Sequence, residues 1–186
     1  MPSFFRFFLA SAFLFILDAS PCLPEVLESQ VKTAYVLNFI KFTEWPAGAP
    51  ADSKMTLCVV GNNVLDGMLA SLDGRKTGDQ EIHVAKFHAD ALLAANKNSI
   101  GILGSCQAMY IGKSEQRRFI SIIKSLGDAP ILTISDIEDF AEYGGNIGLD
   151  YQENKIVFEV NLGSVQKSGL RLPGQLLNLA SNIFRR

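Results

Sequence analysis

The sequence predicts an α/β fold: a layered, mostly parallel open sheet with an antiparallel C-terminal hairpin and helices on both faces. Short β-branched runs alternate with helical segments between residues 54 and 145. Two strand-like runs joined by the polar turn QENK, residues 152–155, then indicate a hairpin. Helical segments close the chain, so strands and helices have to share one core.

The first residues predict a secretory signal peptide. A single cation, Arg6, precedes an apolar run from Phe7 to Leu17, and the chain turns polar at Asp18. A permanent membrane anchor is the alternative, but the run is about half of the roughly 20 residues that a spanning helix needs.

We place the cut of the leader near Cys22. A lipid-modified Cys22 is the other interpretation, although Pro21 is a poor fit to the small residue expected there. Residues 1–22 are then the signal peptide, and residues 23–186 form a single α/β domain.

Two cysteines, Cys58 and Cys106, remain in the exported chain. In an oxidising compartment such a pair favours a disulfide over a catalytic or metal-binding pair. The composition fits one globular domain, with 48% hydrophobic and 19% charged residues. A net charge of -2 provides no basic surface for phosphates, so we expect no nucleic-acid partner.

The segment from Glu25 to Glu44 predicts a largely buried helix. Its polar stripe of Gln30, Thr33, Lys41 and Glu44 is narrow, and apolar residues fill most of the remaining circumference.

Trp45 and Pro46 end this helix, because the residue before a proline is disfavoured in the helical region. One interpretation makes Phe39, Phe42 and Trp45 core packing. The other makes the exposed edge of Trp45 and Pro46 part of a partner-binding surface.

The middle of the chain alternates strands and helices. Buried strands are predicted at Lys54–Gly61, Glu81–Phe87, Cys106–Ile111 and Pro130–Asp136. Helices are predicted after Gly61 and over residues 90–98, 114–128 and 136–145. Ser114 is the expected cap of the third of these, and Phe119, Ile122, Ile123 and Leu126 form its apolar face.

The last third predicts the hairpin over residues 146–162 and two closing helices, over residues 162–169 and 173–184. Pro173 suits the first turn of the second one, where a missing N–H costs little.

Several fragments imitate functional motifs without completing them. Gly112–Ser114 follows a strand as a phosphate loop would, but Gln107 stands where the loop needs its first glycine. Fragments resembling the three elements of penicillin-interacting serine enzymes, Ser121–Lys124, Ser135–Asp136 and Lys76–Gly78, run in the wrong order.

Metal and acid–base chemistry are equally unsupported. His83 and His88 are too few for a zinc site once the thiols bond each other. The acidic pairs Asp136 with Glu138 and Asp139 with Glu142 are expected on the solvated face of a short helix. We therefore expect no enzyme activity, no cofactor and no metal.

The mature chain resembles the YfiR family of bacterial periplasmic proteins. The likeness rests on VKTAYVLNFIKFTEWP, LCVVG, the later lone Cys106, PILTISD, FAEYGGNIGL, KIVFEVNL and SGLRLPGQLLNLA, in this order. The chain differs from some relatives because it lacks a second cysteine pair near the hairpin and has a longer segment from Phe87 to Ser105.

The resemblance implies a regulator without catalysis. Family members restrain an inner-membrane diguanylate cyclase by binding its periplasmic portion, which lowers cyclic di-GMP and biofilm formation. A peptidoglycan-binding lipoprotein of the outer membrane can sequester them. The resemblance also implies that Cys58 and Cys106 match the family's disulfide positions and that the protein forms a homodimer.

The rival hypothesis is a periplasmic small-molecule binding module. Parallel sheets bind ligands in a crevice at the carboxyl ends of their strands. Here that crevice would be lined by Gly61, Asn62, Asn63, Ser135 and Asp136.

Overall fold

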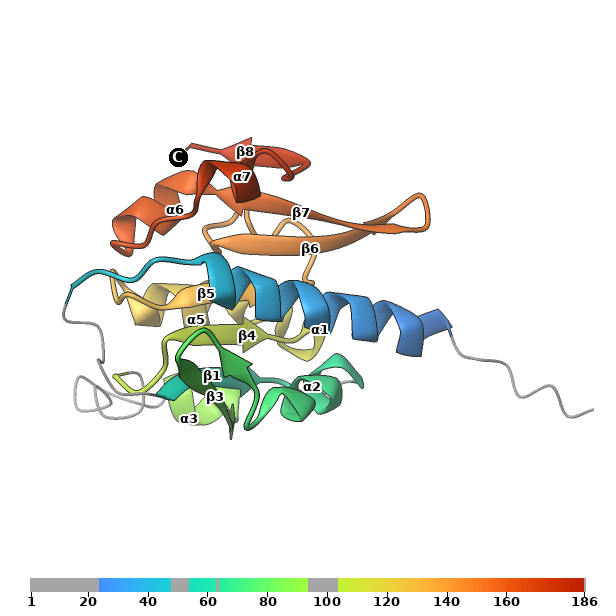
Figure 1. Cartoon of the computed structure of the whole chain (residues 1–186), viewed down its shortest axis with the longest axis horizontal. Helices are drawn as coiled ribbons and strands as arrows, with labels where there is room; N and C mark the ends of the chain where they lie inside the picture. Colours follow the sequence, from blue (N-terminus) through green and yellow to red (C-terminus); the bar gives the residue numbers. More distant parts are fainter. Residues whose placement is uncertain (1–23, 48–53, 63, 94–103, 186) are drawn as a thin grey trace, which may run out of the picture.

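The computed structural model describes residues 24–47, 54–62, 64–93 and 104–185, and these residues build one eight-stranded sheet (Figure 1). The strands lie in the order β2-β3-β1-β4-β5-β6-β7-β8. Their bounds are β1 Lys54–Val60, β2 Lys76–Thr77, β3 Gln80–Phe87, β4 Ala108–Ile111, β5 Leu132–Ser135, β6 Ile147–Gln152, β7 Lys155–Asn161 and β8 Asn182–Phe184.

The sheet is parallel from β3 through β1, β4 and β5 to β6, and antiparallel in the β6–β7 hairpin. β2 also pairs antiparallel, with β3, whereas β8 runs parallel to β7. The predicted mostly parallel sheet with an antiparallel hairpin is therefore confirmed.

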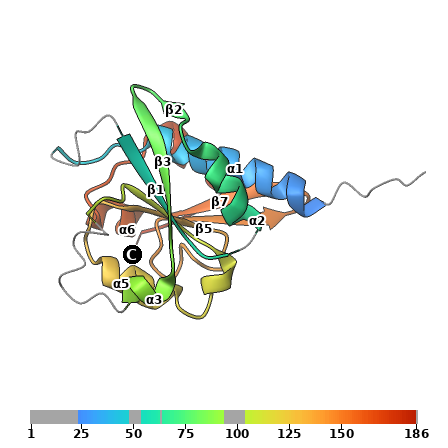
Figure 2. The same ribbon diagram turned by 90° about the horizontal axis from the view of Figure 1, so that it is seen from below.

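Helices cover both faces of the sheet, as predicted (Figure 2). On one face lie α1 (Pro24–Phe42) and α2 (Val64–Leu69), and on the other lie α3 (Ala89–Leu93) and α5 (Phe119–Leu126). The remaining helices are η1 (Ala70–Leu72), η3 (Lys113–Glu115), α6 (Leu162–Lys167) and α7 (Gly174–Leu177). Because strand residues alternate between faces, each face has its own apolar core.

A disulfide joins Cys58 in β1 to Cys106, just before β4. Both cysteines are buried on the face covered by α3 and α5, with their Cα atoms 5.8 Å apart. The bond thus ties two neighbouring parallel strands whose cysteines are 48 residues apart in sequence.

Three helix predictions are wrong in part. Residues 136–145 form turns, because Asp139 has φ 56° and Gly144 has φ 105°, which no right-handed helix accommodates. The helix predicted over residues 114–128 begins as the short η3, and α5 starts at Phe119; Ser114 does not cap it. The predicted helix over 173–184 is limited to α7, and residues 182–184 form β8 instead.

Some predictions lie outside the described residues. These are the signal peptide at residues 1–22, including Cys22, the position of Asn63, and residues 94–98 of the helix predicted over residues 90–98, whose described part is α3. Among the described residues, no helix combines the length and apolarity that crossing a membrane requires.

Candidate functional site

Helix α1 has two halves that pack differently. Its C-terminal half inserts Val36, Phe39 and Ile40 into the core beneath it. Phe42 was predicted to be core, but 46% of it is exposed. Thr33, which the sequence places on the polar stripe of this helix, is also buried. Its hydroxyl donates a hydrogen bond to the Ser29 carbonyl.

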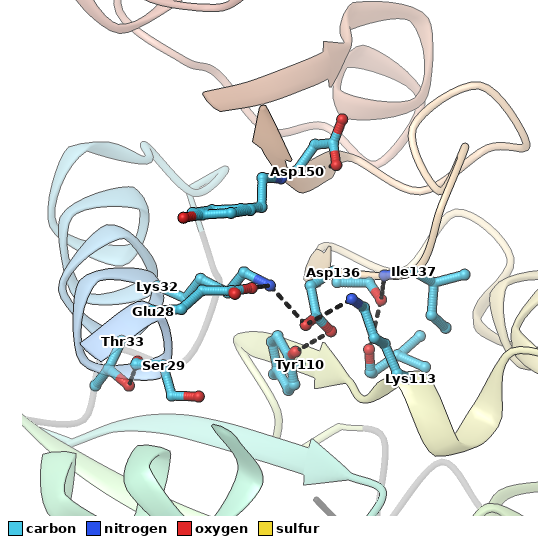
Figure 3. Close-up of polar contacts among 12 residues, drawn as sticks. Glu28, Ser29, Lys32, Thr33, Tyr110, Lys113, Asp136, Ile137 and Asp150 are labelled. Atoms are coloured by element: carbon cyan, nitrogen blue, oxygen red, sulfur yellow. Dashed lines mark hydrogen bonds and ion pairs between the residues drawn. The ribbon is translucent and has the colours of Figure 1, made fainter. Parts of the chain in front are cut away.

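The N-terminal half of α1 turns polar side chains toward the sheet. Lys32 is 3% exposed and contacts two carboxylates, Glu28 one turn earlier at 2.5 Å and Asp136 at 2.9 Å (Figure 3). Burying an ammonium group is costly unless it is paired, and here both partners are in place. The pair therefore fastens this half of α1 to the sheet.

Asp136 follows directly after β5 and connects three elements. Besides Lys32 of α1, it accepts a hydrogen bond from the Tyr110 hydroxyl of β4, and Lys113 of η3 approaches it at 3.8 Å (Figure 3). The prediction of a solvated Asp136 is wrong, because the turn after β5 directs the carboxylate under α1; Glu138 is exposed as expected.

Burial and these charges shift the pKa values of Lys32 and Tyr110. Burial lowers the pKa of Lys32, but hydrogen bonds and charge from Glu28 and Asp136 outweigh it and raise the pKa above its usual value. Burial, reinforced by the negative charge of Asp136, raises the pKa of Tyr110 well above its usual value. Lys32 thus stays charged and Tyr110 stays a neutral donor at neutral pH.

Asp66 of α2 completes the arrangement at the same edge of the sheet. It is buried, and its charge contributes to the raised pKa of Tyr110. Its carboxylate lies against Gly61 and Gly112, the residues that follow β1 and β4. We call Glu28, Lys32, Asp66, Tyr110 and Asp136 the carboxyl-edge cluster.

The close approach of Asp66 explains why glycine follows β4. A Cβ atom on Gly112 would lie 2.8 Å from one carboxylate oxygen of Asp66 and 3.0 Å from the other. We expect Gly112→Ala to lower the free energy of unfolding by about 1–3 kcal/mol, since a packed charged group has to move.

Gly67→Ala is the matched control for this prediction. Gly67 lies in α2, one residue from Asp66, and a Cβ atom there would meet nothing within 4 Å. Alanine in a helix should stabilise by up to about 1 kcal/mol. Equal effects of the two substitutions in urea unfolding would contradict the proposed contact.

The predicted ligand crevice lies at a topological switch point. The chain leaves β1 for β3 on one side, while β4 pairs on its other side. Gly61 and Asn62 follow β1, and the Asn62 amide donates to the Ser114 hydroxyl beyond β4. Ser135 is fully buried, donating to the Ile111 carbonyl and accepting from the Ile137 amide.

The crevice residues are thus at one edge of the sheet, but they differ in access. Asn62 is exposed, whereas Ser135 and Asp136 are buried and bonded within the protein. Ligand binding there stays a prediction.

Trp45 and Pro46 lie on the surface next to the C-terminal region. Trp45 is half-buried against the core, and its indole N–H donates to the Gln107 carbonyl. Pro46 is exposed and lies close to Gly169, while Glu44 forms a bridge with Arg171. Their role in partner binding stays a prediction.

Lys32 and Tyr110 are functional candidates that the sequence interpretation missed. The available signal was the Glu28–Lys32 spacing, which places opposite charges one turn apart on a helix that is otherwise mostly apolar. Such a pair is usually exposed, so only the packing of α1 could reveal its burial.

The fold and the cluster define a mostly parallel α/β domain with a group of buried polar side chains at the carboxyl edge of the sheet. Two solved structures share this fold. The ABC domain in complex with L-Trp from Streptococcus pneumonia has a TM-score of 0.53 and 10% identity over 70% of this chain. A conserved domain protein from Vibrio cholerae has a TM-score of 0.56 and 12% identity over 81%. This chain spans 55% and 59% of their lengths, less than two thirds of either.

The sequence profile of the YfiR/HmsC-like family matches residues 29–181. The chain belongs to the YfiR/HmsC-like family. At the level of the family, this match supports a periplasmic regulator of diguanylate cyclase signalling.

Proposed function

We propose that this protein binds the periplasmic portion of an inner-membrane diguanylate cyclase and inhibits it without catalysis of its own. The observation that carries this proposal is the family match, which covers residues 29–181 and hence every strand of the sheet except β8. Inhibition would lower cyclic di-GMP and limit biofilm formation. A peptidoglycan-binding lipoprotein of the outer membrane would relieve it by sequestering the inhibitor, and a homodimer remains expected.

The proposed mechanism is a population shift in the cyclase. An inhibitor can repress only if it binds the inactive state more tightly than the active state. A rigid binding surface serves this end, because little conformational entropy is then lost on binding. Two features support rigidity, namely the disulfide between β1 and the start of β4 and the ion pair beneath α1.

Direct binding tests this proposal. The exported, oxidised protein is titrated calorimetrically with the purified periplasmic portion of an inner-membrane diguanylate cyclase from the same organism. We expect saturable binding with a dissociation constant of about micromolar or lower, which is typical of specific regulatory pairs. No heat of binding at protein concentrations far above that value would refute it.

A periplasmic small-molecule binding module is the second candidate. The observation that favours it is the switch point near Gly61 and Asn62, where open parallel sheets commonly bind ligands. The similar domain from Streptococcus was solved with L-Trp. A thermal-shift screen against periplasmic metabolites separates the candidates: a hit abolished by a substitution of Asn62 supports this one, and a screen without hits opposes it.

A further inference from the structure

The N-terminal half of α1 exposes apolar side chains and buries a charged one, which is the reverse of an ordinary surface helix. Leu27 is 59% exposed and Val31 39%, whereas Lys32 is 3% exposed. A solvent-facing helix normally buries its apolar stripe and exposes its charges. The apolar surface left outside is therefore available to something other than this domain's own core.

The exposed apolar side chains border a groove rather than a flat face. Leu27, Val31 and Tyr35 form one wall, and Tyr151 and Ile156 of the β6–β7 hairpin form the other. Its volume of about 440 Å³ lies within the range of about 300–1,000 Å³ that binding pockets occupy. The Tyr35 hydroxyl donates to the Ile156 carbonyl at 3.3 Å and so joins the walls.

The two walls carry opposite charges. Glu28 lies on the helix wall, where its contact with Lys32 fixes it, and Lys155 lies on the hairpin wall. An occupant that complements both walls has an apolar centre, a basic side chain facing Glu28 and an acidic side chain facing Lys155. A uniformly anionic surface would meet Glu28 and the adjacent exposed Glu153, which disfavours it.

We propose that the groove between α1 and the β6–β7 hairpin is the docking surface for the cyclase, holding an apolar segment flanked by one basic and one acidic residue. This inference rests on the proposed function. Leu27 and Val31 would supply the apolar contact area, and Tyr151, which is 49% exposed, would close over it. Lys155 would mainly increase the rate of association with the cyclase and fix the orientation of the bound segment.

The test compares variants of the full chain in the same calorimetric titration with the cyclase's periplasmic portion. Leu27→Asp/Val31→Asp should weaken binding about 100-fold or more, as loss of a central apolar contact does. Lys155→Glu should weaken it about 10-fold at low salt and less at high salt. Circular dichroism melting confirms that each variant is folded.

Leu179→Asp is the matched control, because Leu179 is more exposed than either groove residue at 73% and does not line the groove. It should bind within about 3-fold of the wild type. Equal binding by the wild type and the groove variant would overturn the docking proposal while leaving the proposed function intact. Failure of the wild type itself would refute the proposed function instead.

Sedimentation of the same variants tests whether a second copy of this chain occupies the groove. We expect Leu27→Asp/Val31→Asp to leave the oligomeric state unchanged. Conversion of a wild-type dimer to monomer by this substitution would assign the groove to self-association and overturn the proposal.

Discussion

Lys32→Met is expected to lower the free energy of unfolding by about 3–5 kcal/mol, because a buried carboxylate loses its nearest cation and keeps only the exposed Lys113 at 3.8 Å. Asp136 is 7% exposed and 2.9 Å from the Lys32 ammonium, while methionine keeps much of the lysine stem's volume. The cost should therefore come from the lost ion pair rather than from a cavity. Urea unfolding followed by circular dichroism measures it.

Two further variants separate the ion pair from general effects of substitution. Lys41→Met, in the exposed last turn of α1, should change stability by less than about 0.5 kcal/mol. Lys32→Met/Asp136→Asn should regain about half of the loss or more, since the stranded charge is gone and Tyr110 keeps an acceptor. Equal losses for Lys32→Met and Lys41→Met would contradict the pairing.

The contribution of Lys32 also has a defined pH dependence. The folded protein raises the pKa of Lys32, so the stabilisation is fully present below the ordinary lysine pKa and is lost as pH rises through the folded value. The difference in unfolding free energy between wild type and Lys32→Met should thus be constant from neutral to mildly alkaline pH and shrink only in strongly alkaline solution.

Cys58→Ser is expected to destabilise by about 4 kcal/mol, on the chain-entropy estimate for a loop whose ends are 48 residues apart. For a domain of this size the melting temperature should fall by about 10 °C. The substitution removes the cross-link between residues 58 and 106, so the unfolded chain gains conformational freedom. It also places a hydroxyl in a fully buried position. Calorimetric melting under oxidising conditions measures the change.

Reduction provides the control for this prediction. A thiol reductant should lower the melting temperature of the wild type toward that of Cys58→Ser and leave the variant unchanged. Two free thiols in mass spectrometry of protein exported to the periplasm, or a wild type insensitive to reduction after unfolding, would contradict the bond.

The parallel core was predictable because its strands combine two local signals. The runs at 54–61 and 130–136 are β-branched and bounded by turn residues, and each ends where a helix or turn must begin. The end of the chain was not predictable in this way. Ile183 and Phe184 fit a helical pattern, but they pair with the edge strand β7 instead. The Ser181 amide donates a hydrogen bond to the Phe158 carbonyl and so positions these residues beside β7.

Only part of the candidate site was predictable, because its contacts join elements that are distant in sequence. Asp136 could be placed at the carboxyl edge because it follows a buried strand. Its burial depends on Lys32, which is 104 residues away, and on Tyr110 of a neighbouring strand. Contacts between elements so distant in sequence leave no local pattern, so the direction in which α1 faces is a property of the packed fold.

The level of cyclic di-GMP in cells that lack this gene tests the central claim most directly. In a strain where the partner cyclase is present and expressed, deletion should raise cyclic di-GMP severalfold. Wild-type protein supplied to the periplasm should restore the original level, whereas Leu27→Asp/Val31→Asp should not. An unchanged level after deletion would contradict the account.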